Sequence, residues 1–274
     1  MTYIFEIVGQ NRRLFYGSLL IAATHFGGAV ACICAYLSSN KFQHIFMLAG
    51  LIGLLSLKGR AMLTETYVQK ESKNMIFSKY NSSNSTVCSY LNVIAASSCL
   101  IFIFFTIMIY CNKIIIQKFA IDMQTVFFIN LVLHLVWVIF LPIVGIISDR
   151  YSIPIVRIMR TGSIATICIG IPALIFGYHS ENIKIFMIAQ LLVTLTHIIF
   201  CMPTPKMICS FFTINVRNTH VSFSYGIGVS ITAAFMPILN DFFYNNFSIY
   251  GTTGLIAVFA TLGFVSTIGI RDNG

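Results

Sequence analysis

The chain contains the stretch Leu141-Pro-Ile-Val-Gly145-Ile-Ile-Ser-Asp149-Arg150-Tyr-Ser-Ile-Pro-Ile-Val-Arg157-Ile-Met-Arg160, in which an apolar run gives way to a short polar turn before the next apolar run. A glycine lets a neighbouring backbone approach closely, and an Asp-Arg pair at a helix end can join one helix to another where the dielectric constant is low. We therefore interpret Gly145, Asp149 and Arg150 as a contact between two membrane helices. The alternative is a solvated turn with no further role.

The composition excludes several classes of protein. Hydrophobic residues make up 57% of the chain and charged residues only 9%, with a mean hydropathy of +0.87, whereas soluble domains have about 25% charged residues. The net charge of +9 need not indicate nucleic acid, because the loops that hold the charge decide its meaning in such a chain. Most of the eight cysteines lie in apolar runs, which favours small buried hydrophobes over disulfides or metal ligands. We find no catalytic, metal-binding or phosphate-binding motif, so we predict neither an enzyme nor a cofactor.

Eight apolar segments are long enough, or nearly so, to cross the roughly 30 Å hydrocarbon layer of a membrane, which takes about 20 helical residues. Charged residues lie between these segments or at their ends, as expected when one charge at mid-bilayer costs about 2.5–3.5 kcal/mol. We therefore predict an all-α integral membrane protein with about eight spans. The segments are Leu14–Tyr36, Phe42–Leu57, Tyr90–Tyr110, Gln124–Ile147, Thr161–Tyr178, Ile183–Met202, Val221–Leu239 and Tyr250–Ile270.

Lysine and arginine are distributed unequally between the two sides that these spans define. One side receives 13 of the 17, and the other receives only Lys41, Lys113, Lys118 and Lys184. By the positive-inside rule the basic side is cytoplasmic. We therefore predict a multi-pass protein of the cell inner membrane with both termini in the cytoplasm.

The spans fall into two unequal groups. Residues 1–57 hold two spans, residues 58–89 form a polar linker that we place in the cytoplasm, and residues 90–274 hold six spans. Transporters are often built from two repeated halves. The division into two and six spans is therefore the most informative irregularity of this sequence.

Three further stretches, taken with the Gly145–Arg150 motif, carry a resemblance to one family. The chain is similar to the metabolite:proton symporters of the major facilitator superfamily, in particular to those resembling the proline/betaine transporter. The stretches are Tyr3-Ile-Phe-Glu6 followed by Arg12-Arg13-Leu-Phe15-Tyr-Gly17-Ser18, then Arg60-Ala-Met-Leu63-Thr-Glu65-Thr66, and then Val216-Arg217-Asn-Thr219-His-Val-Ser222-Phe-Ser-Tyr225 with Gly228 and Pro237 beyond it.

This resemblance implies a major-facilitator-type helical bundle whose eight spans are equivalent to the last eight of twelve, the first four being absent. It implies that Gly145, Asp149 and Arg150 form a cytoplasmic gate, with Arg60, Glu65 and Arg217 as candidate anchors. The chain departs from the family pattern after Arg150, where Ser152-Ile153-Pro154 replace a glycine and adjacent basic residues, and at Ser210 and His220. Each change removes a charge or a close-packing position, so we expect a weakened gate.

Proton coupling needs titratable groups inside the membrane, and the spans offer His25, His134 and His197 for this role. Each of these is also explained by a buried, hydrogen-bonded histidine with no transport role. His134 and Trp137 lie three residues apart and share a helical face. That face is a candidate cavity lining, where the tryptophan would hold a cationic solute, or it is simply packed.

These observations lead to a hypothesis of function. The chain would transport a small solute of the proline/betaine or organic-acid type by proton-coupled alternating access, as a partial or split symporter. Its partners would be the lipid bilayer, the solute, protons and a second chain that supplies the missing helices. The alternative is a truncated remnant or a membrane interaction subunit without transport activity.

Overall fold

The computed structural model describes residues 2, 8–9, 12–37, 42–61, 86–213, 217–268 and 270, and these form helices without strands. Two of the long helices contain a single π-helical turn, η3 and η4. The helices are α2 (Arg13–Leu37), α3 (Phe42–Ala61), α4 (Thr86–Phe105), η3 (Thr106–Tyr110), α5 (Cys111–Phe119), α6 (Met123–Arg150), α7 (Ile155–Ala165), η4 (Thr166–Gly170), α8 (Ile171–His179), α9 (Ile183–Cys201), α10 (Thr204–Ser210), α11 (Arg217–Phe247) and α12 (Ile249–Val265).

The all-helical architecture predicted from the sequence is confirmed, and it is compatible with a multi-pass membrane protein. Among the described residues, six helices are long and apolar enough to cross a membrane, namely 13–37, 87–119, 123–150, 155–179, 183–210 and 217–247. Two shorter apolar helical stretches, Ala49–Lys58 and Ile249–Val265, lie at the remaining two predicted segments. Each predicted segment therefore overlaps a helix, although only six of the helices have full spanning length.

Several helices are longer than the apolar segments that predicted them. Helix α4 continues through η3 and α5 to Phe119, and α11 continues to Phe247. Lys113 and Lys118 lie beyond the predicted segment that ends at Tyr110, but both side chains extend from α5 and so belong to the same continuous helix. Apolar composition marks only the hydrocarbon-facing part of a helix, and long lysine side chains can extend from there to the aqueous boundary.

The turn in the opening stretch begins later in the chain than predicted. Asp149 and Arg150 are the last residues of α6, so the prediction that they sit in the turn is wrong; residues 151–154 form it. At the opposite end of α6, the Asp122 carboxylate accepts hydrogen bonds from the Thr125 hydroxyl (2.7 Å) and backbone N–H (3.0 Å). These bonds favour the charged form and hold the pKa of the Asp122 carboxyl below its usual value. They satisfy a donor that the first turn of the helix would otherwise leave free.

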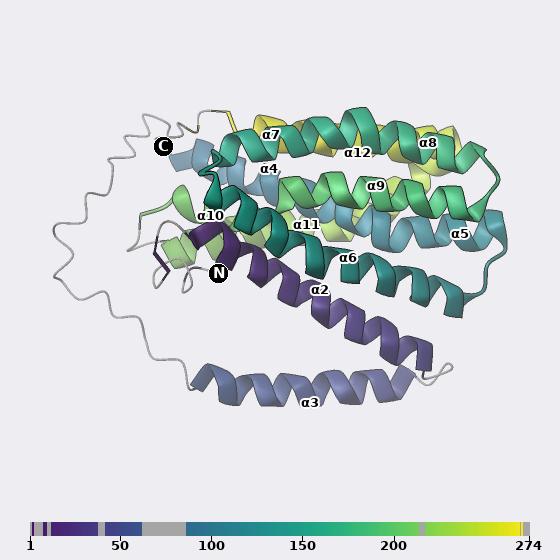
Figure 1. Cartoon of the computed structure of the whole chain (residues 1–274), viewed down its shortest axis with the longest axis horizontal. Helices are drawn as coiled ribbons and strands as arrows, with labels where there is room; N and C mark the ends of the chain where they lie inside the picture. Colours follow the sequence, from purple (N-terminus) through teal and green to yellow (C-terminus); the bar gives the residue numbers. More distant parts are fainter. Residues whose placement is uncertain are drawn as a thin grey trace.

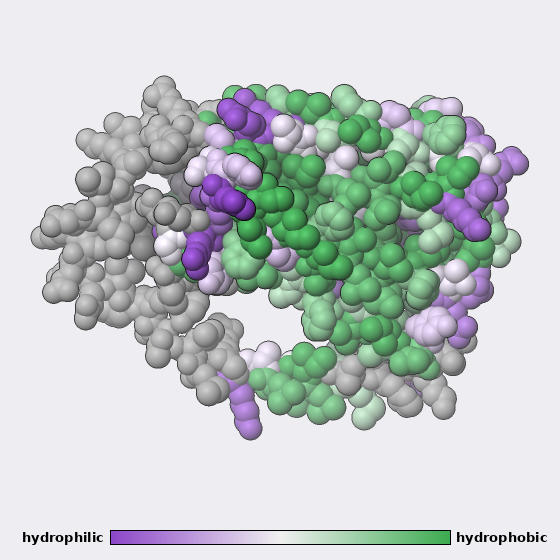
Figure 2. Space-filling model, in the orientation of Figure 1, coloured by the Kyte–Doolittle hydropathy of each residue, from purple (hydrophilic) through white to green (hydrophobic). Residues whose placement is uncertain are grey.

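The helices run up and down between two ends of the bundle (Figure 1). Both chain termini and α10 lie at one end, and the connections from α5 to α6 and from α8 to α9 lie at the other. Apolar side chains cover the face between these ends (Figure 2). The end with the termini carries Arg12, Arg13, Lys58, Arg150, Arg157, Arg160, Lys206 and Arg217 against Asp149, and the other carries Lys113, Lys118 and Lys184 with Asp122, Glu181 and Asp241.

The core lies between the spans 87–119 and 183–210, whose apolar windows are the most buried of the six spanning helices. Its largest fully buried side chains include Phe102, Trp137, Phe186 and Phe200. Helix α3 differs, because every side chain of it that the structure describes is exposed, and it lies to one side of the bundle beyond α2 (Figure 1). Most of the predicted linker, residues 62–85, lies outside the described residues.

Candidate functional site

Helices α2 and α6 pack along their length and form the contact that we call the α2–α6 seam. Two glycines set the distance between them. A Cβ on Gly28 would lie 2.4 Å from the His134 ring, and a Cβ on Gly145 would lie 2.6 Å from Ser18 Oγ and 3.0 Å from the Cα of Phe15. The glycine of the opening motif therefore lies directly against the backbone of α2, and Gly28 provides the space for a histidine side chain.

The middle of the seam holds two histidines in contact. His25 Nδ1 and His134 Nδ1 are 3.3 Å apart. The His25 imidazole is stacked on the Trp137 indole, with 4.2 Å between ring centroids and 9° between ring planes. The Phe104 ring of α4 meets His25 edge-on at 5.1 Å. His25 is 6% exposed and Trp137 is 1% exposed, whereas His134 is partly exposed. Packed aromatic rings therefore shield His25 and Trp137.

A third histidine extends the cluster into the bundle. His197 of α9 is fully buried and its ring meets Trp137 edge-on, with 5.8 Å between centroids. His197 Nε2 lies 3.1 Å from the carbonyl oxygen of Leu100. A carbonyl only accepts, so Nε2 carries the proton and Nδ1 is left as an acceptor in the neutral ring. His197 Nδ1 and Trp137 Nε1 are both buried and make no hydrogen bond within the described residues.

The structure thus brings together all the candidate residues that the sequence placed inside the membrane. His25, His134 and His197 were weighed one by one, because no sequence rule predicts which helices meet. The spacing of His134 and Trp137 predicted a shared face, and His25 contacts both side chains. Phe104 was missed, since one phenylalanine among 25 carries no signal of its own.

The role of His134 and Trp137 in lining a solute cavity stays a prediction. In this structure the His25 ring covers one face of the indole, so a cationic solute would have to displace it to reach that face. Within the part of the chain that the structure describes, no three His, Cys, Asp or Glu side chains are grouped closely enough to hold a metal ion. Ring stacking on Trp137 and the contact between the two imidazoles organise the cluster.

Asp149 closes the seam at the end that carries the termini. Its carboxylate accepts hydrogen bonds from the backbone N–H groups of Leu14 (3.3 Å) and Phe15 (2.8 Å), at the start of α2. The first N–H groups of a helix have no partner inside it, and the helix dipole favours a negative charge there. The acidic residue of the motif therefore caps a neighbouring helix. Arg150 is exposed, with its guanidinium 6.0 Å from the centre of the Tyr151 ring.

Of the three candidate anchors, the structure describes the side chain of Arg217 alone. Arg217 Nε donates a hydrogen bond to the carbonyl of Phe212 (3.2 Å), just after α10, and so links α11 to the turn that precedes it. Glu65 and the side chain of Arg60 lie outside the described residues. The gating roles assigned to Gly145, Asp149 and Arg150 remain predictions.

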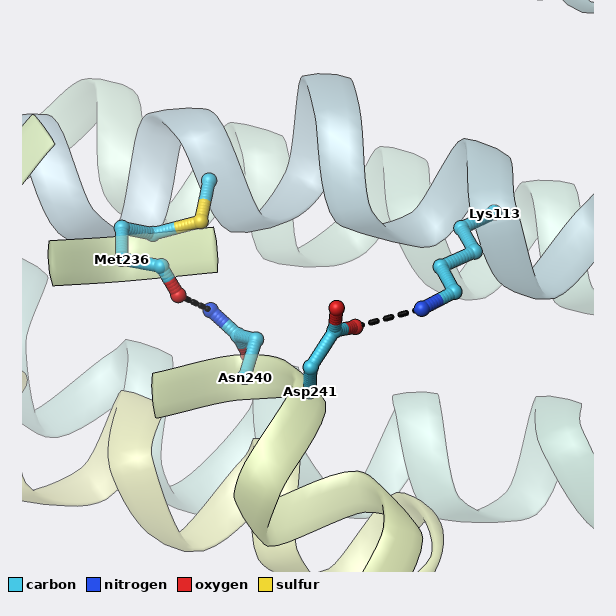
Figure 3. A network of polar contacts seen from close by, with 4 residues as sticks. All are labelled: Lys113, Met236, Asn240 and Asp241. Carbon is cyan, nitrogen blue, oxygen red and sulfur yellow. Dashed lines mark hydrogen bonds and ion pairs between the residues drawn. The ribbon is translucent and has the colours of Figure 1, made fainter. Parts of the chain in front are cut away.

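A second polar set links α4, η3 and α5 to α11, and we call this contact the α4–α11 seam. Asn240 Nδ2 donates to Thr106 Oγ1 and to the Met236 carbonyl, both at 3.2 Å. Lys113 and Asp241 form an ion pair at 2.5 Å one residue further along α11, as Figure 3 shows. Asn240 could not be predicted from the sequence, since a single asparagine at the end of an apolar segment is usually solvated.

No protein-family model, curated protein or solved structure matches this chain.

Proposed function

We propose that this chain is a proton-coupled membrane transporter of a small solute that works by alternating access. The observation that carries the proposal is the His25–His134 contact, a titratable pair halfway along the packed helices α2 and α6. Histidine changes charge near neutral pH. Ionisable groups at this depth are costly and typically mark proton relays and ion pathways.

The position of the pair supports this role. His25 belongs to the two spans that precede the linker, and His134 belongs to the six that follow it. Alternating access rocks one bundle of helices against another around a central site. A charge change at this contact would act on both groups of spans, and the Asp149 cap at the end of the same seam would open and close with it.

The finer identity of the transporter follows from the resemblance. A major-facilitator symporter of the proline/betaine type would move a small zwitterion or an organic acid together with protons. We place the protein in a cell inner membrane with the end that carries the termini in the cytoplasm, because that end is strongly basic and the other is balanced. A second chain, or a second copy of this one, would complete the transport unit.

One observation favours the alternative of a membrane interaction subunit without transport activity. The described side chains of α3 are all exposed, as expected for a helix that binds another membrane protein. Transport and interaction predict different behaviour of the purified chain, so one experiment separates them.

The test is solute uptake into vesicles that contain the purified chain, driven by an inward proton gradient. Labelled proline, betaine and a small organic acid serve as substrates. We expect uptake that collapses with a protonophore and is lost in His25→Asn and His134→Asn, while His179→Asn, an exposed histidine at the far end, retains it. Gradient-independent uptake, or full activity in both seam variants, would refute the proton role.

Absence of uptake by the chain alone, followed by uptake after co-expression with a second membrane protein, would identify a partner-dependent transporter. Absence of uptake in both preparations, with stable binding to that protein, would favour the interaction subunit.

A further inference from the structure

The two facing nitrogens of the seam allow only certain protonation states. The contact joins Nδ1 to Nδ1 at 3.3 Å. A hydrogen bond at this place needs one Nδ1 that carries hydrogen and one that presents its lone pair. When both rings are neutral, this requirement is met if one ring carries its hydrogen on Nδ1 and the other carries it on Nε2.

One added proton is compatible with the contact. The ring that donates through Nδ1 takes the proton on Nε2 and becomes an imidazolium, and the other ring stays neutral and accepts. The bond is then charge-assisted and stronger than before. A second added proton must go to the accepting Nδ1, since the other three ring nitrogens already carry hydrogen. Two N–H groups then face each other, and two positive charges lie together in a low-dielectric layer.

The neighbours of the pair act differently on the two rings. The His25 ring is stacked face to face on the Trp137 indole at 4.2 Å, where a cation over the ring face is stabilised. The His134 ring is tilted by 49° to His25 and rests against Gly28 of α2. Burial opposes a charge on His25, which is 6% exposed, more than on the partly exposed His134. The first proton is therefore held between the two rings, each of which then carries hydrogen on Nε2.

The other elements around the pair offer no countercharge at this depth within the described residues. Helix α4 contributes Phe104 and α9 contributes His197, whose Nε2 is committed to the Leu100 carbonyl. The acidic and basic side chains of the described helices lie toward the helix ends. A doubly charged pair is therefore stabilised only by separation of the rings and entry of water.

We propose that His25 and His134 form a one-proton site, in which the first proton is held between the two rings and tightens the α2–α6 seam and the second parts the two helices. This inference rests on the proposed function and deepens it, because it states what couples proton uptake to opening.

The chain supplies its own probe, since Trp137 is its one tryptophan and lies against His25. The experiment is a pH titration of Trp137 emission, from about pH 8 to about pH 4, on the purified full chain in nanodiscs without solute or gradient. We expect two steps. The first quenches emission as the pair beside the indole becomes positively charged. The second shifts emission to the red and raises quenching by acrylamide, because water reaches the ring.

Three variants assign these steps. His25→Asn is expected to lose the first step, and His134→Asn to keep the first and lose the second. Gly28→Ala retains both histidines but pushes the His134 ring away, because its Cβ would lie 2.4 Å from that ring; it is expected to keep the quenching and lose the red shift. His179→Asn is the matched control and is expected to keep both steps.

A single step in the wild type would overturn the proposal, and so would quenching that survives in His25→Asn. A red shift of normal size in Gly28→Ala would also contradict it, without depending on the folding of a histidine variant. The titration uses no transport assay. The one-proton site can therefore fail while uptake stands, and uptake can fail while the titration shows both steps.

Discussion

The α2–α6 and α4–α11 seams are built from similar parts but differ in the polar contact that each places inside the bundle. Each has a glycine against which the other helix packs, a polar contact inside the bundle and a polar contact at one end. In the α2–α6 seam the inner contact is the imidazole pair His25–His134. In the α4–α11 seam it is the amide-to-hydroxyl bond from Asn240 to Thr106.

This difference separates a contact that can change charge from one that cannot. An imidazole pair can gain and lose protons, whereas amides and hydroxyls stay neutral and keep the same hydrogen bonds. The charged groups of the α4–α11 seam, Lys113 and Asp241, lie near its end. Under the proposed function, α2 would move against α6 while α4 and α11 stay fixed.

Two glycine substitutions give the largest expected contrast between the seams. A Cβ on Gly228 would lie 2.0 Å from Ser97 Oγ and 2.8 Å from the backbone oxygen of Ile94. Gly228→Ala must therefore move backbone, and we expect a loss of about 1–3 kcal/mol in the free energy of unfolding, as for an overpacked core. Gly28→Ala displaces only the His134 ring, and we expect less than about 1 kcal/mol.

Thermal unfolding of both variants in the same detergent tests this prediction, with Gly226→Ala as the control on α11. A Cβ at Gly226 would meet nothing within 4 Å, so that variant should unfold at or above the wild-type temperature. Equal destabilisation by Gly28→Ala and Gly228→Ala would mean that the two seams are equally rigid.

The sequence predicted the helices well and their association poorly, for a physical reason. Lipid-facing apolar residues such as Phe176 and Ile231 report that a helix crosses the membrane, but they do not specify its neighbours. The Gly145–Arg150 motif predicted a helix contact because it combines a small residue with a helix-end charge. The histidine cluster was unpredictable as a cluster, because its members come from three helices far apart in the chain.

The cap at the end of the α2–α6 seam should have the next largest effect. Asp149→Ala removes the acceptor for the N–H groups of Leu14 and Phe15, and loss of such a cap costs about 1 kcal/mol. Asp149→Asn retains one carbonyl acceptor and should cost less. Arg150→Ala, at the exposed neighbouring position, should leave the unfolding temperature unchanged.

The unfolding temperatures of these three variants show how much each side chain contributes to stability. Hydrogen exchange at the start of α2 shows whether the loss occurs at the capped N–H groups. If Arg150→Ala destabilised the chain as much as Asp149→Ala, the contact would depend on the arginine and the capping interpretation would be wrong.

The inner contact of the α4–α11 seam should have a smaller energy that does not depend on pH. A double-mutant cycle with Asn240→Ala and Thr106→Val is expected to give a coupling of about 0.6 kcal/mol, typical of such bonds between membrane helices. Asn246→Ala is the matched control, since Asn246 also donates to the carbonyl four residues earlier but is exposed. Measured at about pH 5 and about pH 8, the coupling should be equal; a large change would remove the distinction between the seams.

The ion pair at the end of the α4–α11 seam should have the smallest effect, although it is the shortest contact there. The Lys113 and Asp241 side chains are 40% and 46% exposed, so water weakens their attraction and ordering both side chains costs entropy. We expect a coupling toward the lower end of about 0.2–1 kcal/mol, which decreases further as salt is raised. A cycle with Lys113→Met and Asp241→Asn at low and high salt measures it. A coupling that is large and insensitive to salt would mean that the pair is shielded from water in the membrane, and the α4–α11 seam would then hold a charge contact as consequential as the histidine pair.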